Sequence, residues 1–416
     1  MRRKVNSTLA QIVGNITQQK ILLAFVVLAL VGVSATPALR LPQLAYAHRI
    51  AVGTPPAATG SRYMQTVDST SGGRCSQAGQ AQGDRSTNAG SPPYPNYDPN
   101  NAKPYNGVVV LDFGAQVNRP ASGGWGTLLI GAGFVRNAQI EECAKQYVLG
   151  YYYRTPATNR NPPRLTVLIG TNNSVTSDTV DPYQAGQQWG SLVNRVSDHF
   201  RDNWPDVYSY IKIASANDIE TDTHSGDWHE SSWTKSWTSG YSNTGQHVYY
   251  NYGTAAGCYP APGTTNPPSS ICDYDPNNPA TVYWRQSDVW YVSRGAMFAR
   301  ALPEIYFGGS GTTPSDVNAR QWQKISLYGY SLTNNTAQKV VFGGSFTQFS
   351  DCGYDCGPGA TTPETGWTQL AEQLNNMDPA YHGYQNPPSS CTSPSSGCHR
   401  TDQLLGWSTD IRFLTP

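Results

Sequence analysis

Two acidic residues stand where a hydrophobic run ends near the middle of the chain. The run IKIASA (211–216) leads into Asn217, Asp218 and, two positions further on, Glu220. In an extended chain every second side chain points to the same side, so Asp218 and Glu220 would lie together, with Cα atoms roughly 6 to 7 Å apart. Paired carboxyl groups suit cleavage of a glycosidic bond, because one donates a proton to the leaving oxygen while the other acts in its ionised form. The sequence predicts Glu220 and Asp218 as catalytic residues; alternatively, Asp218 caps a loop and Glu220 is only solvated.

Two further acidic residues follow or interrupt apolar runs. Asp112 comes directly after the apolar residues 108–111, and Glu304 stands between apolar neighbours in ALPEIYF (301–307). A carboxylate in such surroundings is costly unless it is paired or used. We therefore expect Asp112 and Glu304 to complete the catalytic group. The alternatives are a turn residue at Asp112 and a solvent-facing side chain at Glu304.

Amide, aromatic and acidic residues near other predicted strand ends could bind a substrate. Aromatic rings supply flat apolar area with a polar edge, which suits the apolar face of a sugar ring. We expect substrate contacts from six residues: Asn172, Asn217, Trp228, Trp233, Tyr306 and Asp410. Both tryptophans belong to GDWHESSWTKSW (226–237), which is interpreted as a loop and could equally anchor itself to the fold through them. Asp410 could instead pair with Arg412.

The elements that must position these residues alternate between strands and helices. Eight short β-branched or apolar runs are candidate strands, at 108–112, 165–170, 210–215, 247–252, 288–293, 302–307, 339–344 and 409–413. Helical patterns with plausible N-caps begin near residues 137, 181, 315 and 362. Apolar strands alternating with helices indicate a parallel sheet covered on both faces. The fold class is therefore predicted as α/β, a (β/α)8 TIM-type barrel over residues 106–416.

Two features fit this barrel less well. Residues 221–246 and 253–286 are interpreted as long loops, and little chain separates the fifth candidate strand from the sixth. A doubly wound open sheet is the structural alternative, but no Gly-rich phosphate loop follows the candidate strand at 108–112.

The first 105 residues are expected to lie outside the folded unit. Residues 1–47 carry basic residues before an apolar run and small-residue sites, which is typical of a signal peptide cleaved after Ala35 or Ala47. Without cleavage, residues 21–39 would be just long enough to anchor the chain in a membrane. Residues 48–105, rich in Gly, Ser, Pro, Asn and Gln, predict a disordered low-complexity linker.

Eight cysteines follow the predicted signal, and export makes disulfides the expected state. The pairing that we expect is Cys75 with Cys143, Cys258 with Cys272, Cys352 with Cys356, and Cys391 with Cys398. A zinc site at Cys352 and Cys356 is the competing interpretation, but no CxxC pair or matching histidine spacing accompanies it.

The composition and the absence of several sequence motifs argue against nucleic acid, metal ions and cofactors as partners. The formal net charge is zero, with 28 basic and 28 acidic residues, so no electrostatic footprint for nucleic acid is present. Asp222, His224 and His229 do not have the spacing of a zinc-binding HExxH helix. There is no P-loop, dinucleotide fingerprint or nucleophile elbow either. We therefore expect no cofactor, no metal and no nucleic-acid partner.

The motifs VVVLDFG at 108–114 and NDIE at 217–220 resemble those of family 25 glycoside hydrolases, the muramidases that cleave peptidoglycan. In that family an Asp ends the first strand and an Asp-x-Glu ends a middle strand. The resemblance implies that Asp112 and Asp218 are supporting carboxylates and that Glu220 is the general acid, with Asp410 matching a late-strand Asp. The chain departs from the family in its long His- and Trp-rich segment after Glu220.

Together these observations predict a secreted glycoside hydrolase that acts on peptidoglycan or another extracellular polysaccharide. The alternative is a non-catalytic extracellular barrel that binds glycan or protein. On either hypothesis, contact with a membrane is expected only through an uncleaved N-terminal segment.

Overall fold

A computed structural model describes most of the chain after residue 54. The described residues are 55–89, 106–155, 164–173, 180–221, 230–258, 271–275, 278–306, 317–333, 338–350, 361–375 and 405–413. The predicted signal peptide or anchor (1–47), Trp228, the three possible metal ligands in 222–229 and the last four cysteines lie outside these residues. Within the described part of the chain, none of the helices combines the length and the apolar character needed to span a bilayer.

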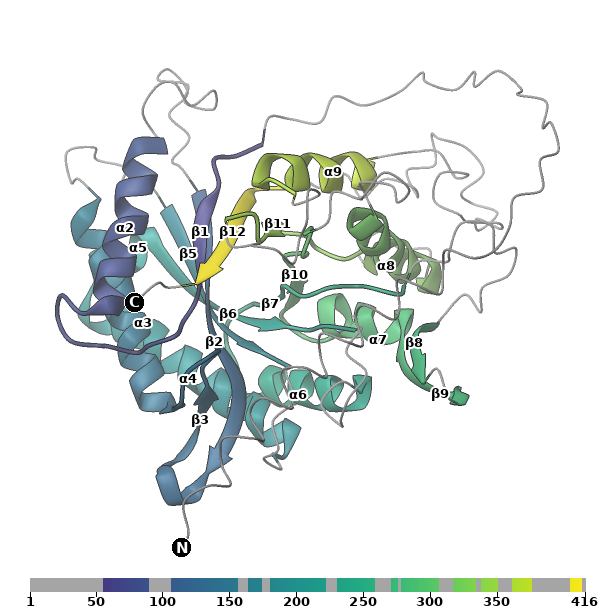
Figure 1. Cartoon of the computed structure of the whole chain (residues 1–416), viewed down its shortest axis with the longest axis horizontal. Coiled ribbons are helices and arrows are strands. Elements are labelled where there is room, and N and C mark those ends of the chain that lie inside the picture. Colours follow the sequence, from purple (N-terminus) through teal and green to yellow (C-terminus); the bar gives the residue numbers. More distant parts are fainter. Residues whose placement is uncertain are drawn as a thin grey trace, which may run out of the picture. The chain divides into compact units, whose positions relative to one another are not determined.

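Eight parallel strands form a nearly closed, barrel-like sheet (Figure 1). Their order around the sheet follows their order along the chain, and each strand pairs with the next one except for the two strands at the ends of the strand order. The strands are β1 (Thr59–Tyr63), β2 (Asn106–Arg119), β5 (Arg164–Asn172), β6 (Ile211–Asp218), β7 (Tyr249–Asn251), β10 (Ala299–Ala301), β11 (Gly344–Thr347) and β12 (Trp407–Phe413). This arrangement is compatible with the predicted TIM-type barrel.

The sheet is brought together at β10 and β11, which are the two ends of its strand order. Parallel bridges join Ala301 to Phe342 and Glu304 to Phe346. The Ile305 backbone N–H donates to the Phe346 carbonyl at 2.8 Å, and the Phe346 N–H donates to the Pro303 carbonyl at 2.9 Å. These bonds place Glu304 at the carboxyl end of the sheet.

Helices connect the strands and cover the outside of the sheet. They are α2 (Arg74–Ala89), α3 (Asn137–Arg154), α4 (Pro182–Asn203), α5 (Pro205–Tyr210), α6 (Ser231–Thr244), α7 (Gln286–Trp290), α8 (Val317–Thr333) and α9 (Pro363–Asn375). The helix predicted from residue 181 is confirmed: the Asp181 side chain caps α4 by accepting from the N–H groups of Tyr183 and Gln184. Two hairpins are added, with β3 (Gly124–Leu128) and β4 (Phe134–Arg136) on β2, and β8 (Ile271–Asp275) pairing with β9 (Asn278–Arg285).

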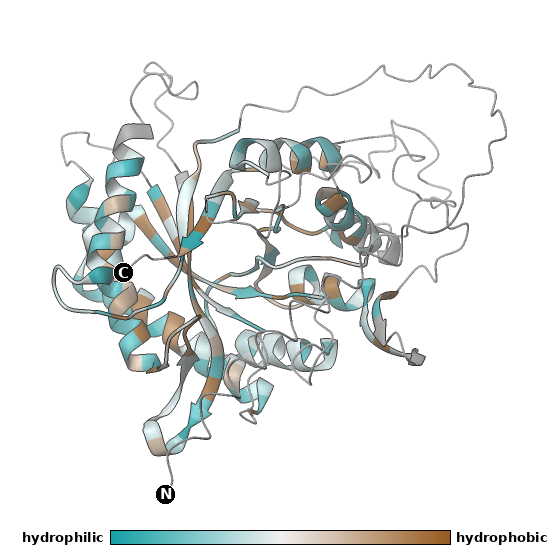
Figure 2. Ribbon diagram, viewed as in Figure 1, coloured by the Kyte–Doolittle hydropathy of each residue, from teal (hydrophilic) through white to brown (hydrophobic). Residues whose placement is uncertain are grey.

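The core has two layers separated by the sheet. Inside it, alternate strand residues such as Val108, Val110, Leu168 and Ala216 form one buried cluster. The residues between them point outward into a larger cluster shared with the helices. Figure 2 shows brown, hydrophobic residues concentrated along the strands, whereas α2 is mostly hydrophilic.

The described part of the predicted linker is folded, which corrects that expectation. Strand β1 lies between β2 and β12, and α2 packs against α3. Strand β1 was missed because its sequence, TGSRY, is polar: the Ser61 hydroxyl accepts from the Val110 N–H at 2.8 Å and bonds Thr409 Oγ1 at 2.7 Å. Helix α2 was missed because it relies on close approach rather than on an apolar stripe. A Cβ at Gly79 would lie only 2.0 Å from the Tyr147 carbonyl oxygen.

Several other segments also differ from the expectation. The predicted loop 253–286 contains the β8–β9 hairpin, and the strands predicted at 302–307 and 339–344 are replaced by β10, which ends at Ala301, and β11, which begins at Gly344.

Residues 288–293, predicted as a strand, belong to α7 and to the π-helical turn Tyr291–Gly295 that follows it. Short apolar runs fit a helix or a strand equally well, and here Asp288 accepts from the Arg285 N–H at 2.9 Å and starts a helix. Most of the predicted loop 221–246 that the structure describes is helix α6.

Two of the predicted disulfides are confirmed. Cys75 pairs with Cys143 and Cys258 pairs with Cys272. The first ties α2 to α3, so it fixes the unit that contains β1 to the rest of the sheet. Two disulfides indicate that the chain folds in an oxidising compartment.

Candidate active site

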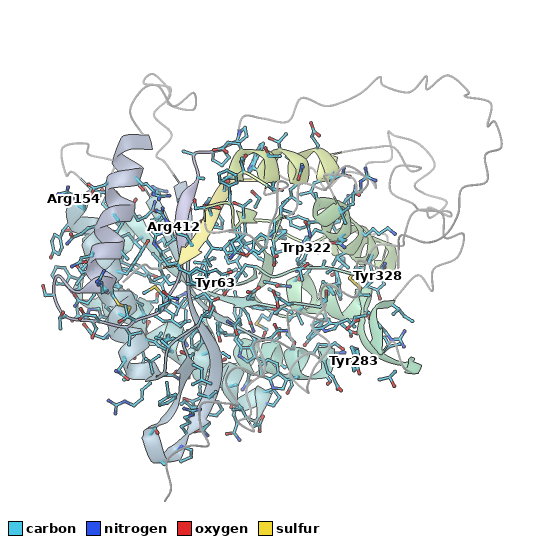
Figure 3. All side chains as sticks on the ribbon, in the orientation of Figure 1. Tyr63, Arg154, Tyr283, Trp322, Tyr328 and Arg412 are labelled. Carbon is cyan, nitrogen blue, oxygen red and sulfur yellow. A yellow bond between two sulfur atoms is a disulfide. The ribbon has the colours of Figure 1, made fainter. Side chains whose placement is uncertain are left out.

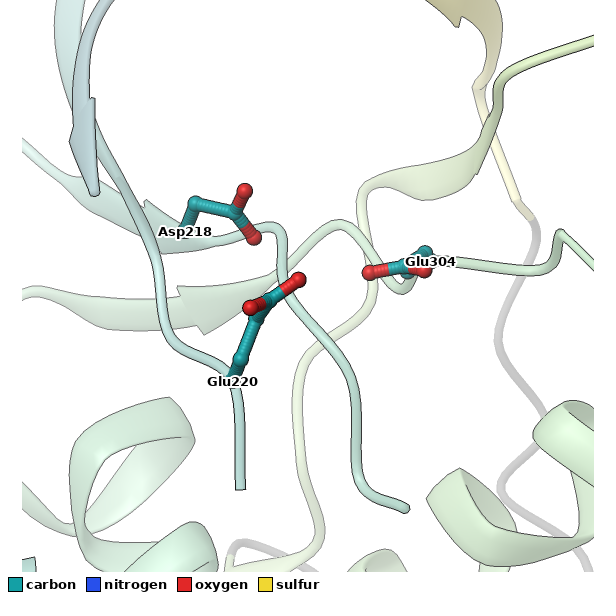
Figure 4. A group of neighbouring side chains, drawn as sticks. All are labelled: Asp218, Glu220 and Glu304. Carbon is teal, nitrogen blue, oxygen red and sulfur yellow. The ribbon is translucent and has the colours of Figure 1, made fainter. Parts of the chain in front are cut away.

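Three carboxyl groups meet at the carboxyl end of the parallel sheet. One oxygen from each of Asp218, Glu220 and Glu304 lies within 4.8 Å of one oxygen from the other two. Figure 4 shows the three groups pointing toward a common space, with Glu304 reaching it from a different segment than Asp218 and Glu220. We call these residues the acidic trio. The structure thus brings together three of the four predicted catalytic residues.

The neighbouring strand ends hold the trio in place. The Asn173 N–H donates to the Asp218 carbonyl at 3.1 Å. The Asn173 side-chain amide both donates to the Glu220 carbonyl at 3.1 Å and accepts from the Glu220 N–H at 3.2 Å. On the other side, the Glu304 N–H donates to the Gly253 carbonyl at 3.2 Å. Backbone positions are therefore fixed on both sides of the space between Glu220 and Glu304.

Asp112, the fourth predicted catalytic residue, is fully buried beside this group. It ends the regular pairing of β2 with β5, where the register shifts between Asp112 and Ala115. Gly114 has a φ of +79° at this bulge, and its N–H donates to Asp112 Oδ1 at 2.7 Å. Burial raises the pKa of Asp112 from its ordinary value to about 6, although hydrogen bonds with Gly114, Tyr252 and Asn172 oppose that shift.

The contact between Asp112 and Tyr252 depends on a glycine. A Cβ at Gly170 would lie 3.1 Å from the Tyr252 hydroxyl and 2.9 Å from Val110 Cγ1, so a larger residue would crowd the hydroxyl as it reaches Asp112. The Tyr252 hydroxyl also donates to the Thr171 carbonyl at 3.0 Å. The phenol has one proton, so it donates either to this carbonyl or to the ionised Asp112 carboxylate. The bond to Asp112 lowers the pKa of that carboxyl group, against the larger effect of burial.

Three tyrosines line the same region. Tyr63 ends β1, Tyr252 follows β7, and Tyr306 follows Glu304 by two positions; the Tyr63 and Tyr306 hydroxyls are hydrogen-bonded. Burial is the largest cause of a pKa well above the ordinary value for all three phenols. The negative charge of Asp218 adds to the rise in each case. All three therefore stay protonated and can donate hydrogen bonds at neutral pH.

The other predicted binding residues fall into two groups. Asn172 lies at the site, where its side chain is hydrogen-bonded to Asp112. Tyr306 also lies there, hydrogen-bonded to Tyr63. Asn217 alternates with Asp218 on β6, so its fully buried side chain lies on the outer face of the strand, away from the acidic trio. Trp233 belongs to α6 and packs in the outer core.

Asp410 is also away from the trio, on the outer face of β12. Its carboxylate accepts from Thr347 Oγ1 at 3.0 Å and from the N–H groups of Phe349 and Ser350 at 2.6 and 3.1 Å. These bonds fix the segment after β11. The structure thus gives Asp410 a local structural role.

Sequence reasoning missed Tyr63, Tyr252 and Asn173. Tyr252 could have been found, because Tyr250 and Tyr252 are alternate residues of a predicted strand and both face the interior. Asn173 follows the strand that carries Asn172, in the motif TNN. Tyr63 carried no usable signal, since the polar strand before it was not recognised.

The acidic trio is also the one group among the described residues that offers three metal-ligand side chains within mutual reach. Carboxylate oxygens are the ligands that Ca²⁺ and Mg²⁺ take in proteins. The donor set therefore fits a hard divalent cation as well as acid–base chemistry, and chelation separates the two.

Comparison with known proteins adds no relative. No protein-family model matches the chain. No curated protein and no solved structure matches it either.

Proposed function

We propose that the protein is a secreted glycoside hydrolase with a TIM-type barrel, acting on an extracellular polysaccharide with retention of configuration. One observation carries the proposal: Glu220 and Glu304 place carboxylate oxygens within 4.8 Å of each other from two different strand ends. Carboxyl groups about 5 to 5.5 Å apart are typical of retaining enzymes, whereas inverting enzymes need about 6.5 to 9.5 Å to admit water. The oxidising compartment that the disulfides indicate supports secretion.

In this mechanism Glu220 is the general acid and Glu304 the nucleophile. The Glu220 carboxyl donates its proton to the glycosidic oxygen as the bond from that oxygen to the anomeric carbon breaks. A Glu304 carboxylate oxygen attacks the same carbon and forms a glycosyl ester. Water then attacks the anomeric carbon, Glu220 takes up its proton, and the ester bond to Glu304 breaks.

Asp218 and Asp112 support this chemistry in different ways. Asp218 lies beside Glu220 on the same strand end, so its charge favours the protonated form of its neighbour. Asp112 is fully buried, so it acts on the site only through Asn172 and Tyr252.

The test is release of reducing ends by the purified full chain from peptidoglycan, chitin and plant glucans. The wild type should release sugar, and Glu220→Gln should release about a thousandfold less. Glu364→Gln is the matched control, because Glu364 is exposed in the first turn of α9 and should leave the rate unchanged. No release by the wild type would remove the enzymatic proposal, and glycan binding without release would favour the non-catalytic barrel.

A further inference from the structure

A pair of phenols forms part of the wall beside the acidic trio. Tyr63 (Figure 3) and Tyr306 are joined by a hydrogen bond between their hydroxyl groups. The Tyr63 ring packs on Phe413 with centroids 4.9 Å apart, and the Tyr306 ring stacks on Phe346 at 6.1 Å. The two hydroxyls are therefore held by their ring contacts as well as by each other. We call Tyr63 and Tyr306 the phenol pair.

The phenol pair has a proton to spare. Each phenol carries one proton, and the hydrogen bond between the two uses one of them. Because an ordinary phenol has a pKa of about 10, both groups stay protonated across the physiological range. The second proton can be donated to an acceptor on a bound molecule.

The charges around the phenol pair are negative. The charged groups that shift the pKa of Tyr63 are Asp218, Asp112 and Glu304, and those that shift Tyr306 are Glu304 and Asp218. Other described tyrosines have mixed surroundings: Arg62 and Arg85 act on Tyr147, whereas Asp206 acts on Tyr152. The wall at the trio thus offers neutral donors and ionised acceptors.

This combination selects for an uncharged ligand. A neutral sugar presents hydroxyl groups that donate to carboxylates and oxygen atoms that accept from a phenol. A sugar with its own carboxylate would meet like charges at close range, where repulsion is strong in a partly buried site.

We propose that the site binds an uncharged sugar ring between Glu220 and Glu304, with an oxygen of that ring accepting a hydrogen bond from the Tyr63–Tyr306 pair. The assignment rests on the proposed glycosidase function and narrows its substrate. Uronic acids are excluded from this position. In peptidoglycan, N-acetylglucosamine fits and N-acetylmuramic acid, with its lactyl carboxylate, does not.

The experiment measures binding by titration calorimetry to the full chain carrying Glu220→Gln, so that turnover does not interfere. The neutral probes are β-1,4-linked hexasaccharides of N-acetylglucosamine and of glucose, and the charged probe is the β-1,4-linked glucuronic acid hexasaccharide. At least one neutral probe should bind more than tenfold more tightly than the charged probe at pH 7. Equal binding, tighter binding of the glucuronic acid probe, or no binding of either neutral probe at millimolar concentration overturns the proposal.

Two added substitutions test the named groups. Tyr63→Phe should weaken binding of the neutral probe about fivefold to tenfold, the size of one lost hydrogen bond, and should leave the glucuronic acid probe no better bound. Asp218→Asn should instead reduce the discrimination between neutral and charged probes. The control is Tyr208→Phe, at a half-buried tyrosine whose ring contacts Lys212 away from the site.

The outcomes separate this proposal from the proposed function. If Tyr63→Phe is folded by thermal melting and binds the neutral probe as tightly as its parent, the phenol pair has no such role even though the wild type hydrolyses glycans. If the binding pattern holds and the wild type releases no sugar, the binding site stands and the enzymatic function fails. If Tyr63→Phe does not fold, the comparison of probes and the Asp218→Asn variant still decide.

Discussion

Two acidic residues of the parallel strands, Asp218 at the end of β6 and Asp410 in the middle of β12, have opposite environments. Asp218 faces the interior, where Glu220, Glu304 and three phenols surround it. Asp410 faces outward and is satisfied by a threonine hydroxyl and two backbone N–H groups of one segment. A carboxylate that is satisfied by its own fold stabilises it, whereas carboxylates gathered face to face repel one another. A cluster of carboxylates that face one another is therefore typical of a site where a ligand, a proton or a cation offsets the repulsion.

The largest effect should come from the trio. Glu304→Gln should lower kcat about a thousandfold or more, because the amide cannot attack the anomeric carbon. Folding should change little, since Gln keeps the shape of the side chain. Hydrolysis rates and thermal melts of the same preparation measure both quantities. A stable variant with full activity would show that Glu304 is not the nucleophile.

Asp112 should make stability depend on pH. Its folded pKa is about 6 against an ordinary value of 3.8, so the folded state holds this proton more tightly than the unfolded chain does. This contribution is complete below pH 3.8 and is lost as pH rises through about 6, a change of about 3 kcal/mol in the free energy of unfolding.

Urea unfolding between pH 4 and 7 measures this change in wild type and in Asp112→Asn. In the variant, the free energy of unfolding should no longer fall between pH 4 and 7 by the amount that Asp112 contributes, because an amide does not titrate. Equal slopes in the two proteins would show that Asp112 keeps an ordinary pKa.

Asp410→Ala should act on stability alone. It leaves a hydroxyl and two N–H groups without their acceptor, which costs about 2 kcal/mol in the free energy of unfolding. Activity per folded molecule should stay unchanged, since the carboxylate lies on the outer face of β12. Asp202→Ala, at an exposed helical residue paired with Arg201, is the control and should cost under about 0.5 kcal/mol. A lower kcat in Asp410→Ala would show that Asp410 contributes to the active site after all.

The smallest expected effect is that of chelation. If the trio works by proton transfer and nucleophilic attack, EDTA followed by desalting should leave the hydrolysis rate unchanged. A loss of activity that Ca²⁺ or Mg²⁺ restores would mean that the three carboxylates hold a cation, and the roles of Glu220 and Glu304 would have to be reassigned.

The contrast between Asp218 and Asp410 also shows how far sequence reasoning reaches. Apolar runs such as 165–170 and 210–215 predicted central strands correctly, and the spacing of Asp218 and Glu220 predicted their shared side. An apolar run does not indicate which face of its strand points into the barrel. Asn217 and Asp410 were therefore assigned to the site although their side chains face outward. That choice is made by pairing with distant strands.

The least predictable region is the polar unit of β1 and α2. Strand β1 is stabilised by hydroxyl bonds to β2 and β12, partners up to 348 residues away. Helix α2 depends on glycines that let α3 approach closely. Neither feature produces an apolar period, so Tyr63 was hidden within a segment that resembled a linker. In α6 the signal was present, because Trp233, Trp237 and Tyr241 recur every four residues and all are buried.

The stereochemistry of cleavage tests the central claim most directly. Proton NMR, started within seconds of adding enzyme to a neutral hexasaccharide that it cleaves, reports which anomer is released first. With Glu220 and Glu304 as close as the structure places them, the first product should keep the anomeric configuration of the substrate. Initial release of the opposite anomer would contradict the account, because inversion needs two carboxyl groups about 6.5 to 9.5 Å apart with a water molecule between them.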